Sequence, residues 1–287
     1  MIPGPRPDLA KLEPFLRKAL EEDVGAGDIT TEATVPEGLV ATGTFLAKAP
    51  LVLAGIDVAL AVLRLTCDGR LVVTSALPDG TRAEPGTVLA TVQGPARGLL
   101  TGERTALNLV QRLSGIATAT REYVDTAAGR LEVLDTRKTT PLLRALEKYA
   151  VRVGGGRNHR FGLFDQILIK ENHARIAGGV RRAIEAARQY KPGMVVEVEA
   201  QSVEEAEEAA SAGADIILLD NLTTPEIREA IRRIAGRARV EISGNVTLAR
   251  MPELATTGAD FVSIGALTHS VRAADISFEI TTTGERA

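Results

Sequence analysis

Cationic side chains recur just after short apolar segments in the second half of this 287-residue chain. Arg137 and Lys138 follow the segment 131–135, and Lys170 follows the segment 166–169. The polar set around them consists of Thr136, Arg137, Lys138, His159, Arg160 and Lys170. Arginine binds carboxylate or phosphate through two parallel contacts, and each charge-assisted hydrogen bond contributes about 1.5–3 kcal/mol. One carboxylate does not need this much positive charge, so the sequence predicts a ligand with several negative charges.

Two carboxylates and two small-residue loops end the later apolar segments. Glu199 ends the segment 195–199, and Asp220 follows 216–219. Magnesium usually binds proteins through one or two carboxylates together with phosphate oxygens and water. The loops can cradle a phosphate with their backbone amides. They comprise Ser243, Gly244 and Asn245 after the segment 240–242, and Ser263, Ile264 and Gly265 at the end of the next one. This pattern indicates a metal-bound phosphate substrate and a second anionic substrate.

The elements that must position these residues have the pattern of a parallel α/β fold. Apolar strand segments at 131–135, 166–169, 195–199, 216–219, 240–242 and 261–264 alternate with helical segments at 141–149, 176–189, 203–212, 225–235 and 248–257. In such folds the carboxyl ends of the strands and their loops form the site. Polar residues cluster at that end in all six strand segments. Six strands, or seven with 151–153, predict an incomplete α/β barrel.

The first part of the chain has a different pattern. Segments 38–48, 71–76 and 87–93 predict strands, and 56–65 predicts a helix, which together give an open α/β sandwich domain.

A long helix over 101–128 follows, with one buried face formed by Ala106, Val110, Leu113, Ala117, Thr120 and Val124. Gly115 predicts a close approach or a break in this helix. The tail segment 275–282 predicts a strand that returns to the first domain.

We therefore divide the chain into an N-terminal domain, 1–110, joined by the C-terminal tail 273–287, and a catalytic barrel domain, 111–272.

Charge and cysteine content exclude several classes of protein. Lysine and arginine number 34 and aspartate and glutamate 37, which gives a net charge of −3. A mildly acidic chain lacks the broad basic face that nucleic acids and anionic membranes require, so we expect small-molecule partners. Cys67 is the single cysteine, which fits a reducing compartment. The segment 1–16 contains prolines where a signal peptide needs an apolar run, so we expect a cytoplasmic protein.

Familiar cofactor motifs are absent from the sequence. The glycines at 25–27 lack the third glycine of a dinucleotide-binding fingerprint, and there is no G-x-x-x-x-G-K-[ST] loop. The three histidines lack the spacing of metal ligands, and we interpret His173 and His269 as structural. Glu197 and Glu199 point to the same side of their strand, and we interpret Glu197, the more deeply placed of the two, as structural.

A set of motifs closely resembles the quinolinate phosphoribosyltransferase family. These motifs are EEDVGAGDITT (21–31), GERTALNLVQRLSGIAT (102–118), DTRKTTP (135–141), EKYAVRVGGGRNHR (147–160), LIKENH (168–173), VEVE (196–199), DIILLDN (215–221), EISGN (241–245) and SIGALTHS (263–270). The resemblance covers nearly the whole chain. It implies transfer of a phosphoribosyl group from 5-phosphoribosyl 1-pyrophosphate to quinolinate, with Mg²⁺. The products would be nicotinate mononucleotide, pyrophosphate and CO₂, in NAD biosynthesis.

The resemblance also implies roles for individual residues. The quinolinate and pyrophosphate pocket would be lined by Arg104, Thr136, Arg137, Lys138, His159, Arg160 and Lys170. Glu199 and Asp220 would face the ribose and its metal, directly or through water and pyrophosphate, and would form the catalytic set with Lys138. The two loops at 243–245 and 263–265 would hold the 5-phosphate.

The family further implies a homodimer or a dimer-based hexamer, with Arg104 reaching the neighbour's site. The chain departs from the family at Leu142, where glycine is usual, so we expect different loop geometry there.

Other functions remain open on the sequence alone. A Schiff-base aldolase would use Lys170 or Lys138 as its nucleophile. A paralogue associated with molybdenum transport shares the family fold. A non-catalytic anion-binding protein would bind phosphoribosyl pyrophosphate without turning it over.

Overall fold

The computed structural model describes residues 6–282, which divide into two compact units. Unit 1 comprises Met1–Ala119, Ala145–Gly155 and Val271–Ala287, and unit 2 comprises Thr120–Arg144 and Gly156–Ser270. The ends of the predicted N-terminal domain and of the predicted tail, 1–5 and 283–287, lie outside the described residues.

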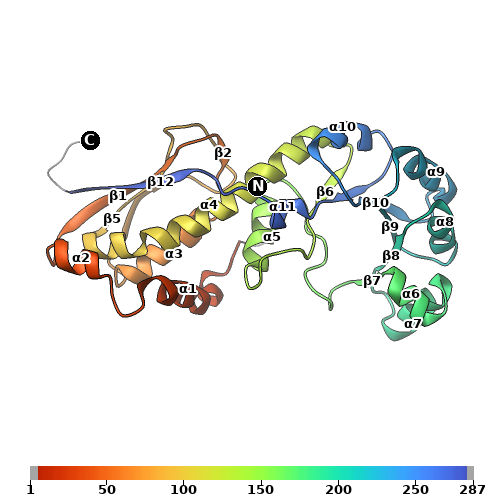
Figure 1. The fold of residues 1–287 in the computed structure, drawn as a ribbon, viewed down its shortest axis with the longest axis horizontal. Coiled ribbons are helices and arrows are strands. Elements are labelled where there is room, and N and C mark those ends of the chain that lie inside the picture. Colours follow the sequence, from red (N-terminus) through yellow and green to blue (C-terminus); the bar gives the residue numbers. More distant parts are fainter. Residues whose placement is uncertain (1–5, 283–287) are drawn as a thin grey trace. The chain divides into compact units, whose positions relative to one another are not determined.

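Unit 1 is built on an antiparallel sheet of order β12-β1-β5-β3 (Figure 1). Its strands are β1 (Val40–Ala47), β3 (Val72–Ala76), β5 (Val88–Pro95) and β12 (Ile276–Thr282). The predicted strands and the returning tail strand are therefore confirmed. β12 pairs with β1 so that Phe278 lies opposite Phe45, with ring centroids 4.5 Å apart. Gly43 leaves room for that ring, because a Cβ at this position would lie 2.2 Å from the Phe278 Cζ.

Helices and a small two-stranded sheet complete unit 1. The sheet pairs β2 (Leu51–Val52) with β4 (Arg82–Ala83). The helices that lie wholly or largely in this unit are α1 (Leu9–Val24), α2 (Ile29–Thr34), α3 (Ile56–Thr66), α4 (Ala96–Ala127) and α5 (Arg144–Val153). The predicted face of α4 is confirmed from Ala106 to Thr120, where five of its residues are buried, whereas Val124, the last of the predicted face, is only half-buried. Gly115 marks a close approach rather than a break, because a Cβ there would lie 2.1 Å from the Arg272 carbonyl oxygen.

Unit 2 contains a parallel sheet of order β6-β11-β10-β9-β8-β7 within the described residues. The strands are β6 (Glu132–Leu134), β7 (Ile167–Ile169), β8 (Val196–Ala200), β9 (Ile216–Asp220), β10 (Arg239–Ser243) and β11 (Phe261–Ser263). The edge strands β6 and β7 form no ladder with each other in the part of the chain that is described, so the barrel is incomplete, as predicted. β9 is buried on both faces, which explains its continuous apolar run.

The helices of unit 2 cover the sheet, with α7 against β7 and β8 and α8 against β8 and β9 (Figure 1). They are α6 (Glu171–Ala177), α7 (Val180–Tyr190), α8 (Val203–Ser211), α9 (Thr224–Ile234), α10 (Met251–Leu254) and α11 (Ala266–His269), with a 3₁₀ turn η1 (Leu248–Arg250). No helix in residues 6–282 is long and apolar enough to cross a membrane.

Three predicted elements need correction. The segment 151–153, considered as a seventh strand, is the end of α5. The helix predicted over 176–189 is two helices, because Gly178 and Gly179 both have positive φ values and end the first of them. The helix predicted over 248–257 is shorter, and consists of η1 followed by α10.

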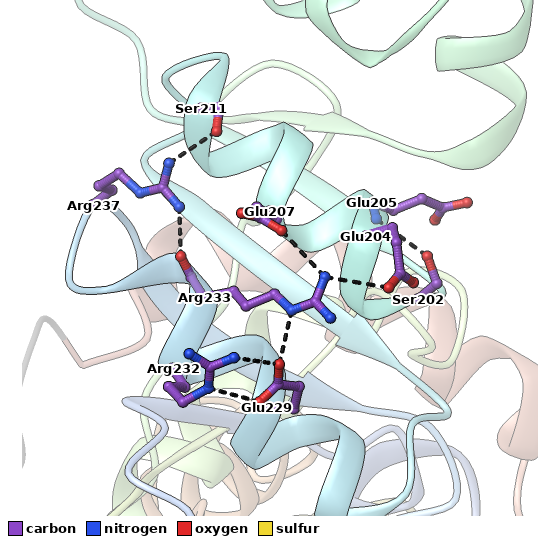
Figure 2. A network of polar contacts seen from close by, with 9 residues as sticks. All are labelled: Ser202, Glu204, Glu205, Glu207, Ser211, Glu229, Arg232, Arg233 and Arg237. Carbon is purple, nitrogen blue, oxygen red and sulfur yellow. Dashed lines mark hydrogen bonds and ion pairs between the residues drawn. The ribbon is translucent and has the colours of Figure 1, made fainter.

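Polar contacts outside the sheet fix the outer helices and the strand starts. Arg233 on α9 contacts Glu229 on the same helix and Glu204 and Glu207 on α8 (Figure 2). At the amino ends of the strands, the Asp215 carboxylate accepts a hydrogen bond from the Val196 N–H at 2.7 Å. Asp260 does the same for the Val240 N–H at 2.8 Å. Asp215 and Asp260, at the amino ends of the strands, therefore help to fix the strand register. The polar residues predicted to bind and react with substrate lie at the carboxyl ends.

Candidate active site

A cavity of about 440 Å³ opens at the carboxyl ends of the strands in unit 2. It is lined by Thr136, Arg137, Lys138, His159, Arg160, Leu168, Lys170, Glu199, Leu218, Asp220, Glu241, Ser243 and Ser263. Five of the six strands contribute a residue of their own, and Thr136, Arg137 and Lys138 come from the loop after β6. A larger hollow of about 890 Å³ lies at the amino ends of the strands. Its acids, Asp215 and Asp260, are occupied by strand amides, so the smaller cavity is the better candidate for chemistry.

Two arginines, Arg137 and Arg160, lie close enough in the cavity for their positive charges to repel. Desolvation lowers the pKa of Arg160 below its usual value, and the neighbouring positive charge of Arg137 lowers it further. The Nε atom of Arg137 is buried and has no hydrogen-bond partner among the described residues. Two like charges and an unsatisfied donor are costly without an anion. This part of the cavity is therefore built to receive a carboxylate or a phosphate.

Buried hydrogen bonds place these cations. Asp135, the first residue after β6, is completely buried and accepts hydrogen bonds from the His159 N–H at 2.9 Å and from Asn158 at 2.5 Å. Arg144 donates to the Thr139 hydroxyl at 2.9 Å and to the Arg137 carbonyl at 3.4 Å. Neither Asp135 nor Arg144 was predicted from the sequence to belong to the site.

Lys138 is held at its backbone and along its side chain. Its carbonyl accepts a hydrogen bond from the Thr268 hydroxyl at 2.7 Å, and its N–H donates to Thr136 Oγ1 at 3.0 Å. A Cβ on Gly265 would lie 3.0 Å from Lys138 Cδ, so a glycine here leaves space for the lysine side chain. The loop after β11 therefore helps to direct this lysine.

The two predicted acids face the same cavity. Glu199 pairs with Lys170, and its side chain is 12% exposed. Asp220 accepts a hydrogen bond from Asn221 Nδ2 at 2.9 Å, and Asn221 in turn accepts from Asn245 Nδ2 at 3.0 Å. This chain of contacts links the ends of β9 and β10.

The loop after β10 requires glycine at its centre. Gly244 has φ +87°, and a Cβ there would lie 2.8 Å from the backbone nitrogen of Asn221. Ser243 and Ser263 line the cavity, whereas the following predicted residues Gly244, Asn245, Ile264 and Gly265 are not among its lining residues. Those four lie in the two loops that continue from the lining serines.

A buried group of acids lies beside the cations. Glu197 accepts hydrogen bonds from Gln166 Nε2 at 2.6 Å and from His159 Nε2 at 3.0 Å, consistent with a structural role. The other ring nitrogen of His159, Nδ1, accepts the Arg160 N–H at 2.7 Å. Glu241 Oε2 lies 3.5 Å from His159 Nε2. Glu241 was not predicted as a site residue. Its position as a charged residue in the middle of an apolar strand segment could have indicated it.

The remaining predicted residues lie elsewhere. Arg104 is an exposed residue of α4 in unit 1. His173 Nδ1 accepts the Lys170 N–H at 3.0 Å and caps α6, and His269 Nδ1 lies 2.6 Å from the Ser270 hydroxyl. Both histidines have the structural contacts expected of them. Leu142 has φ +67°, a conformation that favours glycine.

Comparisons with known proteins agree over most of the chain. The family model "Quinolinate phosphoribosyl transferase, N-terminal domain" matches residues 28–114, and the corresponding C-terminal domain model matches 116–279. A nicotinate-nucleotide pyrophosphorylase [carboxylating] from Mycobacterium leprae is 47% identical, covering 92% of this chain and 95% of that protein. A mitochondrial quinolinate phosphoribosyltransferase [decarboxylating] 2b from Nicotiana tabacum is 41% identical, covering 94% and 82%.

Solved structures of similarly named proteins have the same fold as this chain. The crystal structure of NadC from Streptococcus pyogenes has a TM-score of 0.94 at 43% identity, and covers 97% of this chain and 99% of that one. The nicotinate-nucleotide pyrophosphorylase from Francisella tularensis has a TM-score of 0.92 at 37% identity, covering 96% and 98%. The likeness in sequence and in fold therefore extends through both units.

Proposed function

The chain belongs to the quinolinate phosphoribosyltransferase family, and on this premise we propose that it transfers a phosphoribosyl group from 5-phosphoribosyl 1-pyrophosphate to quinolinate with decarboxylation. The products are nicotinate mononucleotide, pyrophosphate and CO₂, in NAD biosynthesis. The observation that carries the proposal is the cavity in which four cations, Arg137, Lys138, Arg160 and Lys170, lie together with the acids Glu199 and Asp220. Both substrates are multiply charged anions, and a phosphoribosyl transfer also needs acids near the sugar.

The cationic part of the cavity suits the quinolinate dicarboxylate. The unsatisfied Nε of Arg137 and the adjacent guanidinium of Arg160 can each bind a carboxylate. Lys138 and Lys170 supply point charges for the remaining carboxylate and for pyrophosphate. His159 supports Arg160 through its backbone contact and has both ring nitrogens engaged within the protein.

The acidic residues suit a magnesium ion bound with pyrophosphate. Glu199 and Asp220 offer hard oxygen donors in one cavity, and neither is completely buried, so the donor set fits Mg²⁺. When bound, Mg²⁺ would offset the negative charge that grows on the leaving pyrophosphate. The metal would be held directly or through water and pyrophosphate oxygens.

The two small-residue loops suit the 5-phosphate. Ser243 and Ser263 present hydroxyls to the cavity, and the following backbone amides of Gly244, Asn245 and Gly265 lie in the same loops. Backbone amides bind phosphate without requiring a further charged side chain.

The reaction then follows from positioning and electrostatics. The bond between ribose C1 and the pyrophosphate oxygen breaks with its electrons going to pyrophosphate, and the sugar becomes electron-poor. Glu199 or Asp220 stabilises the positive charge on the sugar. The pyridine nitrogen forms the new bond to C1, held in line by the arginines. The resulting pyridinium accepts the electrons released when the bond between C2 and its carboxylate breaks and CO₂ leaves, and a proton then adds to C2.

A direct assay tests the proposed function. The protein is incubated with quinolinate, phosphoribosyl pyrophosphate and Mg²⁺, and CO₂ and pyrophosphate are measured together. Equal amounts of the two products are expected. Binding of phosphoribosyl pyrophosphate without turnover would favour an anion-binding protein, and trapping of a carbonyl substrate by borohydride would favour a Schiff-base enzyme.

The assembly expected from the family is part of the same proposal. The enzyme acts as a homodimer or a dimer-based hexamer, and Arg104 completes the neighbour's site. The exposed position of Arg104 on α4 supports this role. Mixing the separately inactive Arg104→Ala and Lys138→Ala variants should restore part of the activity, because mixed dimers contain one intact site. Light scattering distinguishes the dimer from the hexamer. We expect the enzyme in the cytoplasm, which the single buried thiol of Cys67 supports.

A further inference from the structure

Glu241 lines the cavity but has no role in the binding scheme above. Its side chain projects from β10 and the residue is only 1% exposed. Its Oε1 atom has no hydrogen-bond partner among the described residues. Its Oε2 atom lies 3.5 Å from His159 Nε2, which is bonded more closely to Glu197 at 3.0 Å. One carboxyl oxygen of a buried acid is therefore left unsatisfied beside the cavity.

The surroundings of Glu241 favour its neutral, protonated form. Its pKa is raised to about 8, chiefly by burial and next by the negative charge of Glu197 on β8. Asp135, the first residue after β6, acts in the same direction. His159 and the Ser263 hydroxyl on β11 oppose the shift without cancelling it. At neutral pH most molecules thus carry an acidic proton at this position.

The proposed reaction needs a proton in this cavity. Loss of CO₂ leaves an electron pair on C2 of the pyridinium ring, and that carbon must gain a hydrogen before nicotinate mononucleotide is complete. The rival donors that line the cavity are His159, Lys138 and Lys170. His159 Nε2 lies 3.0 Å from the Glu197 carboxylate, and its Nδ1 accepts the Arg160 N–H, so both ring nitrogens are engaged within the protein. Lys170 is ion-paired with Glu199, and an ammonium that binds a substrate anion is held away from the ring carbon by that contact.

We propose that Glu241 is the acid that delivers this proton to C2, an inference that rests on the proposed function. The carboxyl O–H bond of Glu241 breaks as the C2–H bond forms, and the electron pair left by CO₂ becomes the new C–H bond. Glu241 remains as a carboxylate and regains its proton from water after the product leaves. No oxidant, reductant or further reactant is needed.

The test separates the two halves of the reaction in a single turnover. Pyrophosphate release reports phosphoribosyl transfer, and nicotinate mononucleotide reports completion. Glu241→Gln keeps the size of the protonated acid but cannot donate a carboxyl proton. We expect pyrophosphate release within about threefold of wild type and a fall of at least about 30-fold in product formation, with the decarboxylation substrate, quinolinate mononucleotide, accumulating. Glu241→Asp should restore part of the second step.

The matched control is Glu132→Gln, which removes a carboxylate of β6 that is exposed, pairs with Arg157 and lies outside the cavity. Both steps should be unchanged in this variant. A second measurement needs no variant: in wild type the second step should slow tenfold per pH unit at pH values well above 8, while pyrophosphate release does not follow that pH dependence.

Four results would overturn the inference. In Glu241→Gln, either wild-type rates of both steps or an equal loss of both steps would contradict it. In wild type, a second step that does not slow above pH 8 would do the same. So would stoichiometric Zn²⁺ binding to the substrate-free protein that is lost in Glu241→Gln. The last result would place a cation, rather than a proton, among His159, Glu197 and Glu241, whose ligand atoms lie within 4.8 Å of one another. Failure of wild type to release pyrophosphate would instead contradict the proposed function.

Discussion

Lys170 and Glu199 form an ion pair between neighbouring strands, with Lys170 Nζ donating to Glu199 Oε2. Lys170 is the first residue after β7, and Glu199 lies near the end of β8. Without substrate, each side chain neutralises the charge that the other would offer to a ligand. A bound anion near the lysine and a cation near the glutamate would give both charges new partners, so this pair couples the two sides of the cavity.

Replacement of this lysine should weaken substrate binding more than it weakens the fold. Lys170→Met removes one charge-assisted contact to an anionic substrate, worth about 1.5–3 kcal/mol, so KM should rise about 10–100-fold. The Lys170 side chain is 48% exposed and that of Glu199 12%, so the pair is half-exposed and its loss should cost about 1 kcal/mol of stability. Steady-state kinetics and thermal unfolding measure the two effects. Arg232→Met, which breaks an ion pair on α9, is the control and should leave KM unchanged.

Arg137 and Lys138 should matter for turnover while the fold survives their loss. Arg137→Ala or Lys138→Ala removes a positive charge that balances the leaving group and the carboxylates, and each should lower kcat at least about 100-fold. Circular dichroism and the unfolding temperature should stay close to wild type. Arg157→Ala, which changes an exposed arginine outside the cavity, should retain full turnover. Wild-type turnover in both site variants would remove these residues from the mechanism.

The sequence predicts the parallel sheet of unit 2 well because each strand is a short apolar run that ends in polar residues. Those ends meet at one edge by the geometry of parallel strands alone. The hydrophobic pattern could not show which buried polar groups contact and position the residues that line the cavity. Asp135 and Glu241 are buried, and their contacts come from residues on other strands and loops that lie far away in sequence.

The segment Ala145–Gly155 shows the same limit at the level of domains. Within unit 1, Arg112 pairs with Glu147 at 2.8 Å, and Tyr149 donates a hydrogen bond to Asp79 at 2.7 Å. These long-range contacts attach the segment to a unit from which it is distant in sequence. The local hydrophobic pattern does not predict these long-range contacts. The end of α5 contains the β-branched residues Val151 and Val153, which favour strands, so the local pattern also allowed a strand there.

Leu142 should be replaceable by glycine with a gain in stability. Its φ of +67° costs an L-residue about 1–2 kcal/mol, and its side chain is 88% exposed, so little packing offsets that cost. Glycine avoids the strain but loses about 0.5–1 kcal/mol of backbone entropy, so the net gain should be about 0.5 kcal/mol. Urea unfolding measures the change. Leu143→Gly is the control: Leu143 is half-buried and outside the positive-φ region, so its replacement should destabilise the protein.

The raised pKa of Glu241 should make stability depend on pH in a known direction. The folded protein keeps this proton up to about pH 8, whereas the unfolded chain releases it near pH 4.5. Between these values the folded state binds more protons, so this residue's contribution to the free energy of unfolding falls as the pH rises. The loss should amount to a few kcal/mol across the window, on the order of 1.4 kcal/mol per pH unit at most. Urea unfolding at pH 5, 6, 7 and 8 measures it. In Glu241→Gln the part of the pH dependence of the free energy of unfolding that comes from Glu241 should disappear, whereas Glu132→Gln should keep it. If the free energy of unfolding depends on pH in the same way in Glu241→Gln and in wild type, Glu241 is already ionised in the folded protein.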